Sequence, residues 1–211
     1  MATFLDVGLT GGICCGKSTA QRLFATLGCH TLDSDAIYHQ LIQPGRPLHA
    51  RLVEWLGERV LDGRNRIDRV VLGEIVFNDD EALKKLNAIA HPMVVDEQER
   101  LKREIQAEGN GGIMITDAAL MIEAGTYERY DKIVVVSCDP DEQLRRLMLR
   151  TRLDADSARR RIASQMSAEE KLGYADYPIY NSESLEALKR QVEEVYAHLV
   201  LDLRAKERGR V

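Results

Sequence analysis

A nine-residue stretch near the start of the chain, Gly11–Thr19, constrains the fold more than any other feature. It fits the pattern G-x-x-x-x-G-K-[ST], in which glycines allow successive backbone N–H groups to turn toward a polyphosphate. The mostly apolar residues 4–10 predict a buried strand before it, and apolar residues at helical spacing predict a helix over 18–27 after it. Strand, loop and helix therefore come in the order that a phosphate-binding loop needs, and we expect a nucleoside triphosphate to bind here.

Two side chains of this loop have specific expected roles. Lys17 should reach the terminal phosphates, and the Ser18 hydroxyl should ligate Mg²⁺. A glycine-rich turn that contains a lysine by chance is the alternative, and the flanking strand and helix count against it. The expected nucleotide-binding positions are Gly11, Gly12, Ile13, Cys14, Cys15, Gly16, Lys17, Ser18 and Thr19.

The composition limits the class of protein. A chain of 211 residues with 45% hydrophobic content can build one sizeable core and at most two small lobes. The net charge of −5 gives no sign of a nucleic-acid-binding surface, and no apolar run reaches the roughly 18 residues that a membrane span needs. The first residues lack a basic stretch followed by an apolar core, so we expect no secretion signal, and the four cysteines lack metal-site spacing. We therefore expect a cytoplasmic protein with reduced thiols, bound neither to nucleic acid nor to a membrane, and its oligomeric state stays open.

Acidic residues follow two predicted strands. Asp33 and Asp35 come at the end of the strand expected near 29–33, and Asp117 ends the apolar run 113–117. Because ligands of parallel sheets bind beyond the carboxyl ends of the strands, Asp33 and Asp35 are candidates for a general base and a metal ligand, and Asp117 for a Mg²⁺ ligand. The structural alternatives are that Asp33 or Asp35 only caps the next helix and that Asp117 only bonds a nearby loop.

The rest of the pattern predicts an α/β protein of the P-loop type, with a doubly wound parallel sheet of about five strands and flanking helices. Further strands are expected over 132–138 and 178–181, and a closing helix over 185–203. Residues 36–110 have almost no strand signal and form a helical insertion that we expect to bind substrate. Within it, one helix should span 47–61, and Pro92 should end or kink a helix that begins near Asp79.

Seven arginines follow the strand expected over 132–138. Most should lie on a solvated face, but one or two could close over the phosphates and stabilise the transition state. They are Arg145, Arg146, Arg150, Arg152, Arg159, Arg160 and Arg161. We expect one domain with a core over 1–35, 111–140 and 175–211, a substrate lobe over 36–110, and an arginine-rich lid over 141–174.

Several motifs in order resemble the dephospho-CoA kinase family over nearly the whole chain. The first part of the resemblance is carried by GLTGGI before GKST, by Asp33-Ser34-Asp35, and by Pro44-Gly45. Later motifs complete it: Val76-Phe77, Leu86-Asn87-Ala88, His91-Pro92, Leu120 to Gly125, Gln143 to Arg146, Ala163-Ser164-Gln165 and Ala175-Asp176.

This resemblance implies transfer of the ATP γ-phosphoryl group to the ribose 3′-hydroxyl of dephospho-CoA. It implies Asp35 as the catalytic base and Arg150 as a lid arginine on the phosphates, with Lys17, Ser18 and Thr19 at the ATP and Mg²⁺ positions. The acceptor would lie near Asp33, His91, Pro92, Leu120 and Glu123.

The chain departs from the family pattern at three places. Cys14-Cys15 replaces Gly-Ser, and we expect a strained backbone at position 14 if φ is positive there, together with a thiol whose oxidation or alkylation inactivates the protein. Ala119 replaces a proline, and Tyr180-Asn181-Ser182 changes the segment near the adenine end.

Two other functions compete with this one. Another small-molecule kinase of the same fold would act on a nucleoside or nucleotide, and sequence alone does not define the acceptor pocket. A nucleotide-dependent switch is the alternative from a different class, and the absence of an N/T-K-x-D segment counts against a GTPase.

Overall fold

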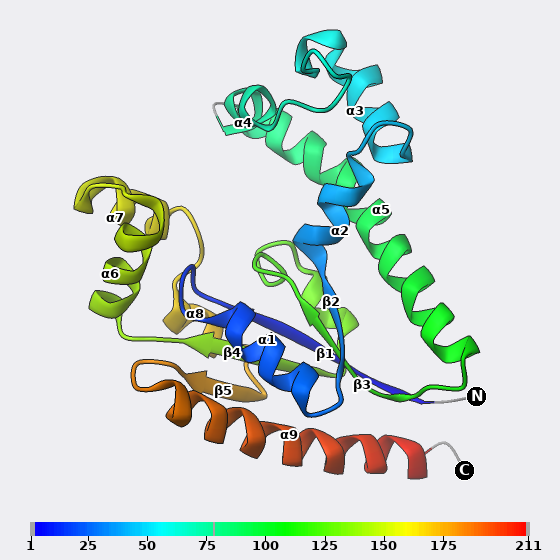
Figure 1. Cartoon of the computed structure of the whole chain (residues 1–211), viewed down its shortest axis with the longest axis vertical. Helices are drawn as coiled ribbons and strands as arrows, with labels where there is room; N and C mark the ends of the chain where they lie inside the picture. Colours follow the sequence, from blue (N-terminus) through cyan, green and yellow to red (C-terminus); the bar gives the residue numbers. More distant parts are fainter. Residues whose placement is uncertain (1–2, 78, 210–211) are drawn as a thin grey trace. The chain divides into compact units, whose positions relative to one another are not determined.

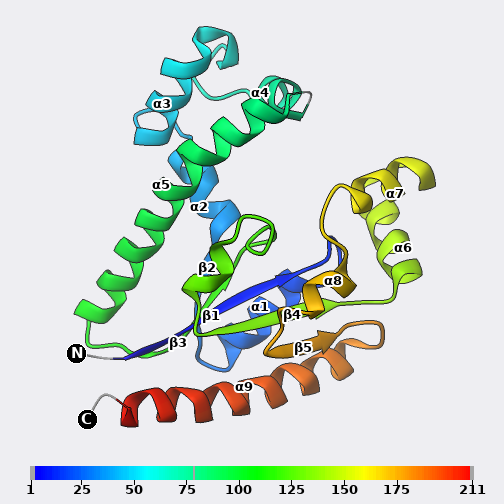
Figure 2. The same ribbon diagram turned by 180° about the vertical axis from the view of Figure 1, so that it is seen from behind.

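The computed structural model describes residues 3–77 and 79–209, and the chain divides into two compact units (Figures 1 and 2). The sheet unit contains the described chain up to Leu32 and from Gly109 onward. The helical unit is Asp33–Glu108.

A five-stranded sheet forms the centre of the sheet unit, in the order β2-β3-β1-β4-β5. β1 pairs in parallel with β3 and with β4, and β4 pairs in parallel with β5. The predicted parallel sheet of about five strands is therefore confirmed. The strands are β1 (Phe4–Gly11), β2 (His30–Asp33), β3 (Gly112–Asp117), β4 (Lys132–Ser137) and β5 (Tyr177–Tyr180).

Both faces of this sheet are buried, as the continuous apolar run of β4 predicts. Val134 and Val136 share a core with α1 (Lys17–Thr26) and α9 (Leu185–Arg208), which lie side by side in Figure 1. Ile133 and Val135 belong to a second core, with residues from 118–130 and from the end of α8 (Ala168–Leu172). Alternate side chains of β4 thus point to opposite faces of the sheet and contribute to both cores.

The segment expected to be the lid contains α6 (Pro140–Thr151), α7 (Ala155–Ala163) and α8. Asp139 caps α6 by accepting from the N–H groups of Asp141 and Glu142, and Asp154 caps α7 in the same way. α6 ends where Arg152 takes the left-handed conformation, with φ 58°. A short 3₁₀ turn, η2 (Thr126–Arg129), precedes β4.

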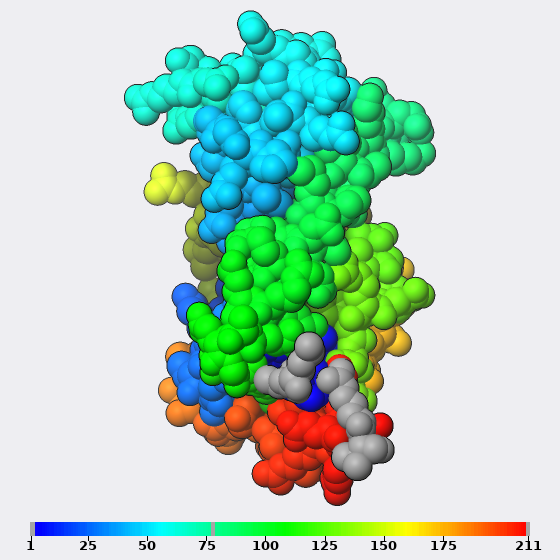
Figure 3. All heavy atoms as spheres, turned by 90° about the vertical axis from the view of Figure 1, so that its right-hand side faces the viewer, coloured from blue at the N-terminus to red at the C-terminus, as the bar shows by residue number. Residues whose placement is uncertain are grey.

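The helical unit consists of α2 (Ser34–Leu41), α3 (Pro47–Leu56), η1 (Glu58–Val60), α4 (Arg69–Phe77) and α5 (Asp80–Ala107). α5 contacts α2, α3 and α4, and Figure 3 shows the blue residues of α2 directly against the green residues of α5. The helix predicted over 47–61 is too long. α3 stops at Leu56 because Gly57 takes a positive φ of 72°, and η1 follows.

Of the two outcomes predicted for Pro92, a helix end and a kink, the helix end is wrong. α5 runs from Asp80 to Ala107 as one helix with Pro92 inside it. Proline removes one backbone hydrogen bond, but the remaining bonds of a 28-residue helix and its packing against three neighbouring helices hold the segment together. Within the described residues, no helix combines the length and the apolar character that a membrane span requires.

Candidate active site

Residues 12–16 form the loop between β1 and α1, and the backbone requires glycine both at the last residue of β1 and at the last residue of the loop. Gly11 and Gly16 have positive φ values of 152° and 98°. A Cβ at Gly11 would overlap the carbonyl of Val136, and one at Gly16 would overlap the side-chain amide of Asn181. Glycine is therefore required at both positions, because of the positive φ and because a Cβ atom would clash with neighbouring atoms.

Cys14 also takes a positive φ, of 59°, as expected if the chain keeps the loop conformation without glycine there. A non-glycine residue in this region costs roughly 1–2 kcal/mol. Cys14 is partly exposed, whereas Cys15 is fully buried. The two adjacent thiols thus have different environments.

Two buried side-chain amides hold the carbonyl side of the loop. Gln143 of α6 donates through Nε2 to the carbonyl of Ile13 at 2.9 Å, and Asn181 donates through Nδ2 to the carbonyl of Cys15 at 2.8 Å. Thr19 and Ala20 donate to the carbonyl of Gly16, so the first turn of α1 begins directly at the end of the loop. Backbone N–H groups at such a position attract anions.

Lys17 and Asp117 meet at the carboxyl edge of the sheet. Asp117 is the last residue of β3, in register with Leu9, and its carboxylate forms an ion pair with the ammonium group of Lys17. Both side chains are largely buried. Asp117 thus contacts the first turn of α1, and the residues predicted to bind phosphate and metal lie in direct contact.

The oxygen groups near the loop suit Mg²⁺. Ser18, in the first turn of α1, is exposed and offers a hydroxyl, and Asp117 offers a carboxylate. The described residues contain no cluster of three or more His, Cys, Asp or Glu side chains that could hold a metal. A Mg²⁺ ion bound through nucleotide phosphates needs only one or two protein oxygens, so the residues present fit this ion.

The segment after β3 contains two of the predicted acceptor residues. Leu120 is exposed, whereas Glu123 pairs with Lys171 of α8 at 2.9 Å and accepts from the N–H group of Met166. Lys171 is fully buried and also donates to the carbonyl of Ala119 at 2.7 Å. Glu123 thus has a structural partner that sequence reasoning missed.

Ala119, at which the family resemblance leads us to expect a proline, has a backbone carbonyl that accepts two hydrogen bonds. Its carbonyl accepts from the Thr10 hydroxyl at 3.1 Å as well as from Lys171. The replacement of proline therefore leaves this turn fixed by two side chains from other elements.

The helical unit places Asp33 and Asp35 in different roles. Asp33 accepts from the N–H group of Ala36 and caps α2, which is the structural alternative for this residue. Asp35, in the first turn of α2, is exposed, and its carboxylate has no hydrogen-bond or ion-pair partner among the described residues. Of the two carboxylates, Asp33 is engaged in a helix-capping hydrogen bond, whereas Asp35 is exposed.

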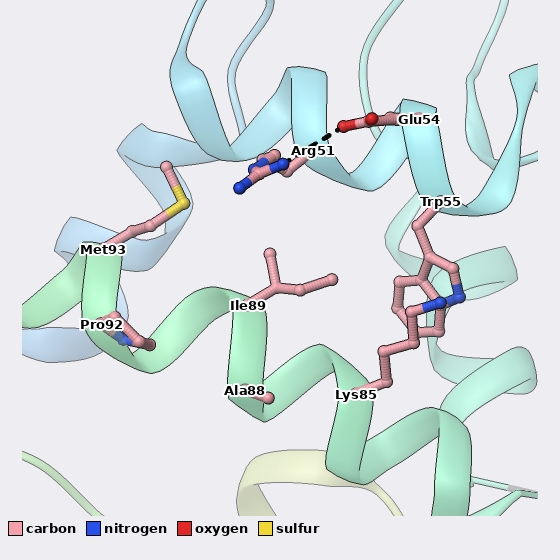
Figure 4. Close-up of a pocket in the computed structure, with 8 residues that line it drawn as sticks. All are labelled: Arg51, Glu54, Trp55, Lys85, Ala88, Ile89, Pro92 and Met93. Carbon is pink, nitrogen blue, oxygen red and sulfur yellow. Dashed lines mark hydrogen bonds and ion pairs between the residues drawn. The ribbon is translucent and has the colours of Figure 1, made fainter.

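His91 and Pro92 lie within α5. Burial lowers the pKa of His91. Pro92 lines a pocket of about 530 Å³ between α3 and α5, in which Lys85 lies 5.1 Å from the ring centre of Trp55 (Figure 4). Arg51 and Glu54 of α3 pair on the opposite wall.

Of the seven arginines in the lid segment, Arg145 and Arg146 both pair with Glu142 at 2.7 Å. The hydrogen bonds from Arg145 and Arg146 lower the pKa of Glu142 to about 2. Arg150, in the last turn of α6, is exposed and has no side-chain partner in the part of the chain that the structure describes. Its charge is therefore available to a ligand.

Two features define the class of protein. The glycine loop lies between the first strand and the first helix of a parallel sheet, and Lys17 lies beside a carboxylate at the end of a strand. These features are those of P-loop nucleoside triphosphate-binding proteins. Comparison with known proteins narrows this class. The family model described as dephospho-CoA kinase matches residues 5–187. The chain belongs to the dephospho-CoA kinase family.

Individual relatives agree. The dephospho-CoA kinase of Aquifex aeolicus is 38% identical, covering 93% of this chain and 98% of the relative. The crystal structure of TT1252 from Thermus thermophilus matches with a TM-score of 0.76 and 31% identity, over 94% of this chain and 98% of that one. The dephospho-CoA kinase from Campylobacter jejuni matches with a TM-score of 0.61 and 27% identity, over 94% and 99% of the two chains.

Proposed function

We propose that this chain transfers the γ-phosphoryl group of ATP to the ribose 3′-hydroxyl of dephospho-CoA, with release of ADP and coenzyme A. This is the final step of coenzyme A synthesis. The observation that carries the proposal is the glycine loop with its Lys17–Asp117 contact, in a chain that matches the dephospho-CoA kinase family from residue 5 to residue 187.

On the nucleotide side, the loop backbone would bind the phosphates and Lys17 would contact the terminal ones. Ser18 and Asp117 would hold Mg²⁺, whose charge would offset that of the phosphates. Because Lys17 is paired with Asp117, binding would exchange this ion pair for contacts of Lys17 with phosphate oxygens. The direct contact of the two side chains supports a shared site.

On the acceptor side, Asp35 would accept the proton of the attacking hydroxyl. Its exposed carboxylate without a partner supports this role, and Asp33 is already used as a helix cap. Phosphoryl transfer requires mainly positioning and charge stabilisation, so one carboxylate near the hydroxyl is enough.

Arg150 would supply positive charge to the phosphoryl group in the transition state. Its exposure and lack of a partner support this role over Arg145 and Arg146, which are held by Glu142. Closure of the lid segment would exclude water, which competes with the hydroxyl as an acceptor.

The remaining acceptor contacts would come from Asp33, His91, Pro92, Leu120 and Glu123. For Glu123 we propose a supporting role, because its carboxylate is bound by Lys171 and by the N–H group of Met166. We place the protein in the cytoplasm, and the four unpaired cysteines support a reducing compartment.

The proposal is tested by measuring ADP release with ATP and Mg²⁺. Dephospho-CoA is offered beside a panel of nucleosides and nucleoside monophosphates, and Lys17→Met is the control for background hydrolysis. We expect turnover with dephospho-CoA only, and its loss in the variant. Preferential turnover of a nucleoside would overturn the acceptor while leaving the fold and the nucleotide site intact.

A further inference from the structure

Two buried thiols contact each other beneath the phosphate loop. Cys15 belongs to the loop, and Cys138 is the first residue after β4. Their sulfur atoms lie 2.9 Å apart, and the exposed fractions of the two residues are 0% and 7%. Neither cysteine is in a disulfide, and neither thiol has a part in the proposed phosphoryl transfer.

We infer that Cys15 and Cys138 are an oxidation site, at which a peroxide forms a disulfide that ties the phosphate loop to the end of β4 and weakens nucleotide binding. A disulfide bond is about 2.05 Å long, so the sulfur atoms need to approach by only about 0.9 Å. The effect on nucleotide binding rests on the proposed role of the loop, whereas formation of the bond does not.

The surroundings indicate which sulfur reacts first. The hydrogen bond with Cys15 lowers the pKa of Cys138, and the positive charge of Arg146 lowers it further. The same hydrogen bond, together with burial, raises the pKa of Cys15. Because the thiolate is the nucleophile and Cys138 is the less buried of the two, Cys138 is the first site of attack.

The reaction balances with hydrogen peroxide as the oxidant. The Cys138 thiolate attacks one peroxide oxygen, the O–O bond breaks, and a sulfenic acid and hydroxide form. The Cys15 sulfur then attacks the sulfur of Cys138, the S–O bond breaks, and the S–S bond forms. The two thiol protons leave in the two water molecules, so two sulfur atoms are oxidised while one peroxide is reduced.

The backbone contacts of Cys15 explain why the bond would disturb the nucleotide site. Its N–H group donates to the carbonyl of Gly12, and its carbonyl accepts from Asn181. A covalent link through its side chain would therefore restrain the loop from a third direction. We expect about tenfold weaker nucleotide binding, and by reciprocity nucleotide should disfavour the disulfide by the same factor, which is about 30 mV for a two-electron couple.

The test uses the full chain, treated with hydrogen peroxide, and peptide mapping by mass spectrometry without reductant. We expect a cross-linked peptide pair that contains Cys15 and Cys138 and has lost two hydrogen atoms. The pair should be absent in Cys138→Ser and in Cys138→Ala, and should persist in Cys29→Ala, which replaces another buried cysteine. Thermal melts of the reduced variants are the control that each variant is folded.

A second readout is the affinity for a non-hydrolysable ATP analogue, before oxidation, after it, and after reduction with dithiothreitol. We expect a reversible loss of about tenfold in the native chain and none in Cys138→Ser. Oxidation of the folded protein at Cys14, without a Cys15–Cys138 link, would overturn the assignment of Cys15 and Cys138 as the oxidation site. A link that leaves the affinity unchanged would overturn its effect on the loop. Failure of dephospho-CoA to act as a substrate would affect neither readout.

Discussion

The ammonium group of Lys17 and the carboxylate of Asp117 form an ion pair that joins the first turn of α1 to the end of β3. The pair is largely buried, so each charge is balanced mainly by the other charge and not by water. ATP and Mg²⁺ together would supply both charges with new partners, the phosphates for Lys17 and the cation for Asp117. Before the nucleotide binds, the ion pair therefore neutralises the charges of both side chains.

This relationship predicts the effect of Asp117→Asn on the metal dependence of the reaction. Loss of one anionic oxygen ligand should raise the free Mg²⁺ concentration for half-maximal turnover by about tenfold, because carboxylate charge contributes strongly to binding a hard cation. The measurement is ADP release at fixed ATP over a range of free Mg²⁺. Glu123→Asp, a carboxylate change on the same segment after β3, should leave this dependence in place. An unchanged Mg²⁺ dependence in Asp117→Asn would rule out Asp117 as a metal ligand.

The two carboxylates at the start of α2 offer a matched comparison for the base. Asp35→Asn should reduce kcat by about 10²- to 10⁴-fold, because the amide cannot accept the hydroxyl proton. Asp33→Asn should reduce kcat by much less, because asparagine caps a helix as well as aspartate does. Both variants are measured by ADP release at saturating ATP and dephospho-CoA. Equal effects of the two substitutions would contradict the assignment of Asp35 as the base.

The amide of Gln143 predicts a change in nucleotide affinity. Gln143→Leu leaves the Ile13 carbonyl without its donor, and a lost buried hydrogen bond costs about 1–3 kcal/mol. We expect about a tenfold weaker affinity for a non-hydrolysable ATP analogue, measured by calorimetric titration, since 1.4 kcal/mol is a factor of ten. Gln191→Leu is the control, because Gln191 bonds the backbone of Tyr180 and not the loop. Similar losses in both variants would show that the effect is general destabilisation.

The pair formed by Lys171 and Glu123 predicts an asymmetry in stability. Glu123→Gln should lower the free energy of unfolding by about 3–5 kcal/mol, because it leaves a fully buried ammonium group without a carboxylate. Lys171→Met should cost less, because the side chain of Glu123 is 25% exposed and water can solvate its charge. Urea denaturation of both variants measures the two values. A larger loss in Lys171→Met than in Glu123→Gln would refute this account of the pair.

Local patterns were enough to predict the sheet, the phosphate loop and the closing helix. The apolar run of β4 and the spacing of Leu188, Val192, Val195 and Leu199 in α9 each reflect burial, which a short stretch of sequence records. At Cys14 the sequence left the sign of φ open, and the structure has the positive φ for which backbone strain is expected. A helix end at Pro92, one of the two outcomes predicted there, does not occur, because packing on three helices outweighs one lost hydrogen bond.

The partners that hold the site could not be predicted in this way. Gln143 and Asn181 bond loop carbonyls 130 and 166 positions away in the sequence. The family resemblance singles out both segments, but nothing in the local sequence indicates that these two amides bond the loop. Lysine side chains are usually exposed to solvent, yet the fold fully buries Lys171 beside Glu123. Only the tertiary structure brings such residues together.

The most direct test of the proposed reaction is to locate the new phosphate in the product. Purified protein is incubated with ATP, Mg²⁺ and dephospho-CoA, and the product is analysed by tandem mass spectrometry and by phosphorus–proton correlation NMR. The account predicts one added phosphoryl group, a phosphomonoester coupled to the ribose H3′ proton, formed together with one ADP. A phosphate on another hydroxyl, or ADP release without any phosphorylated dephospho-CoA, would contradict it.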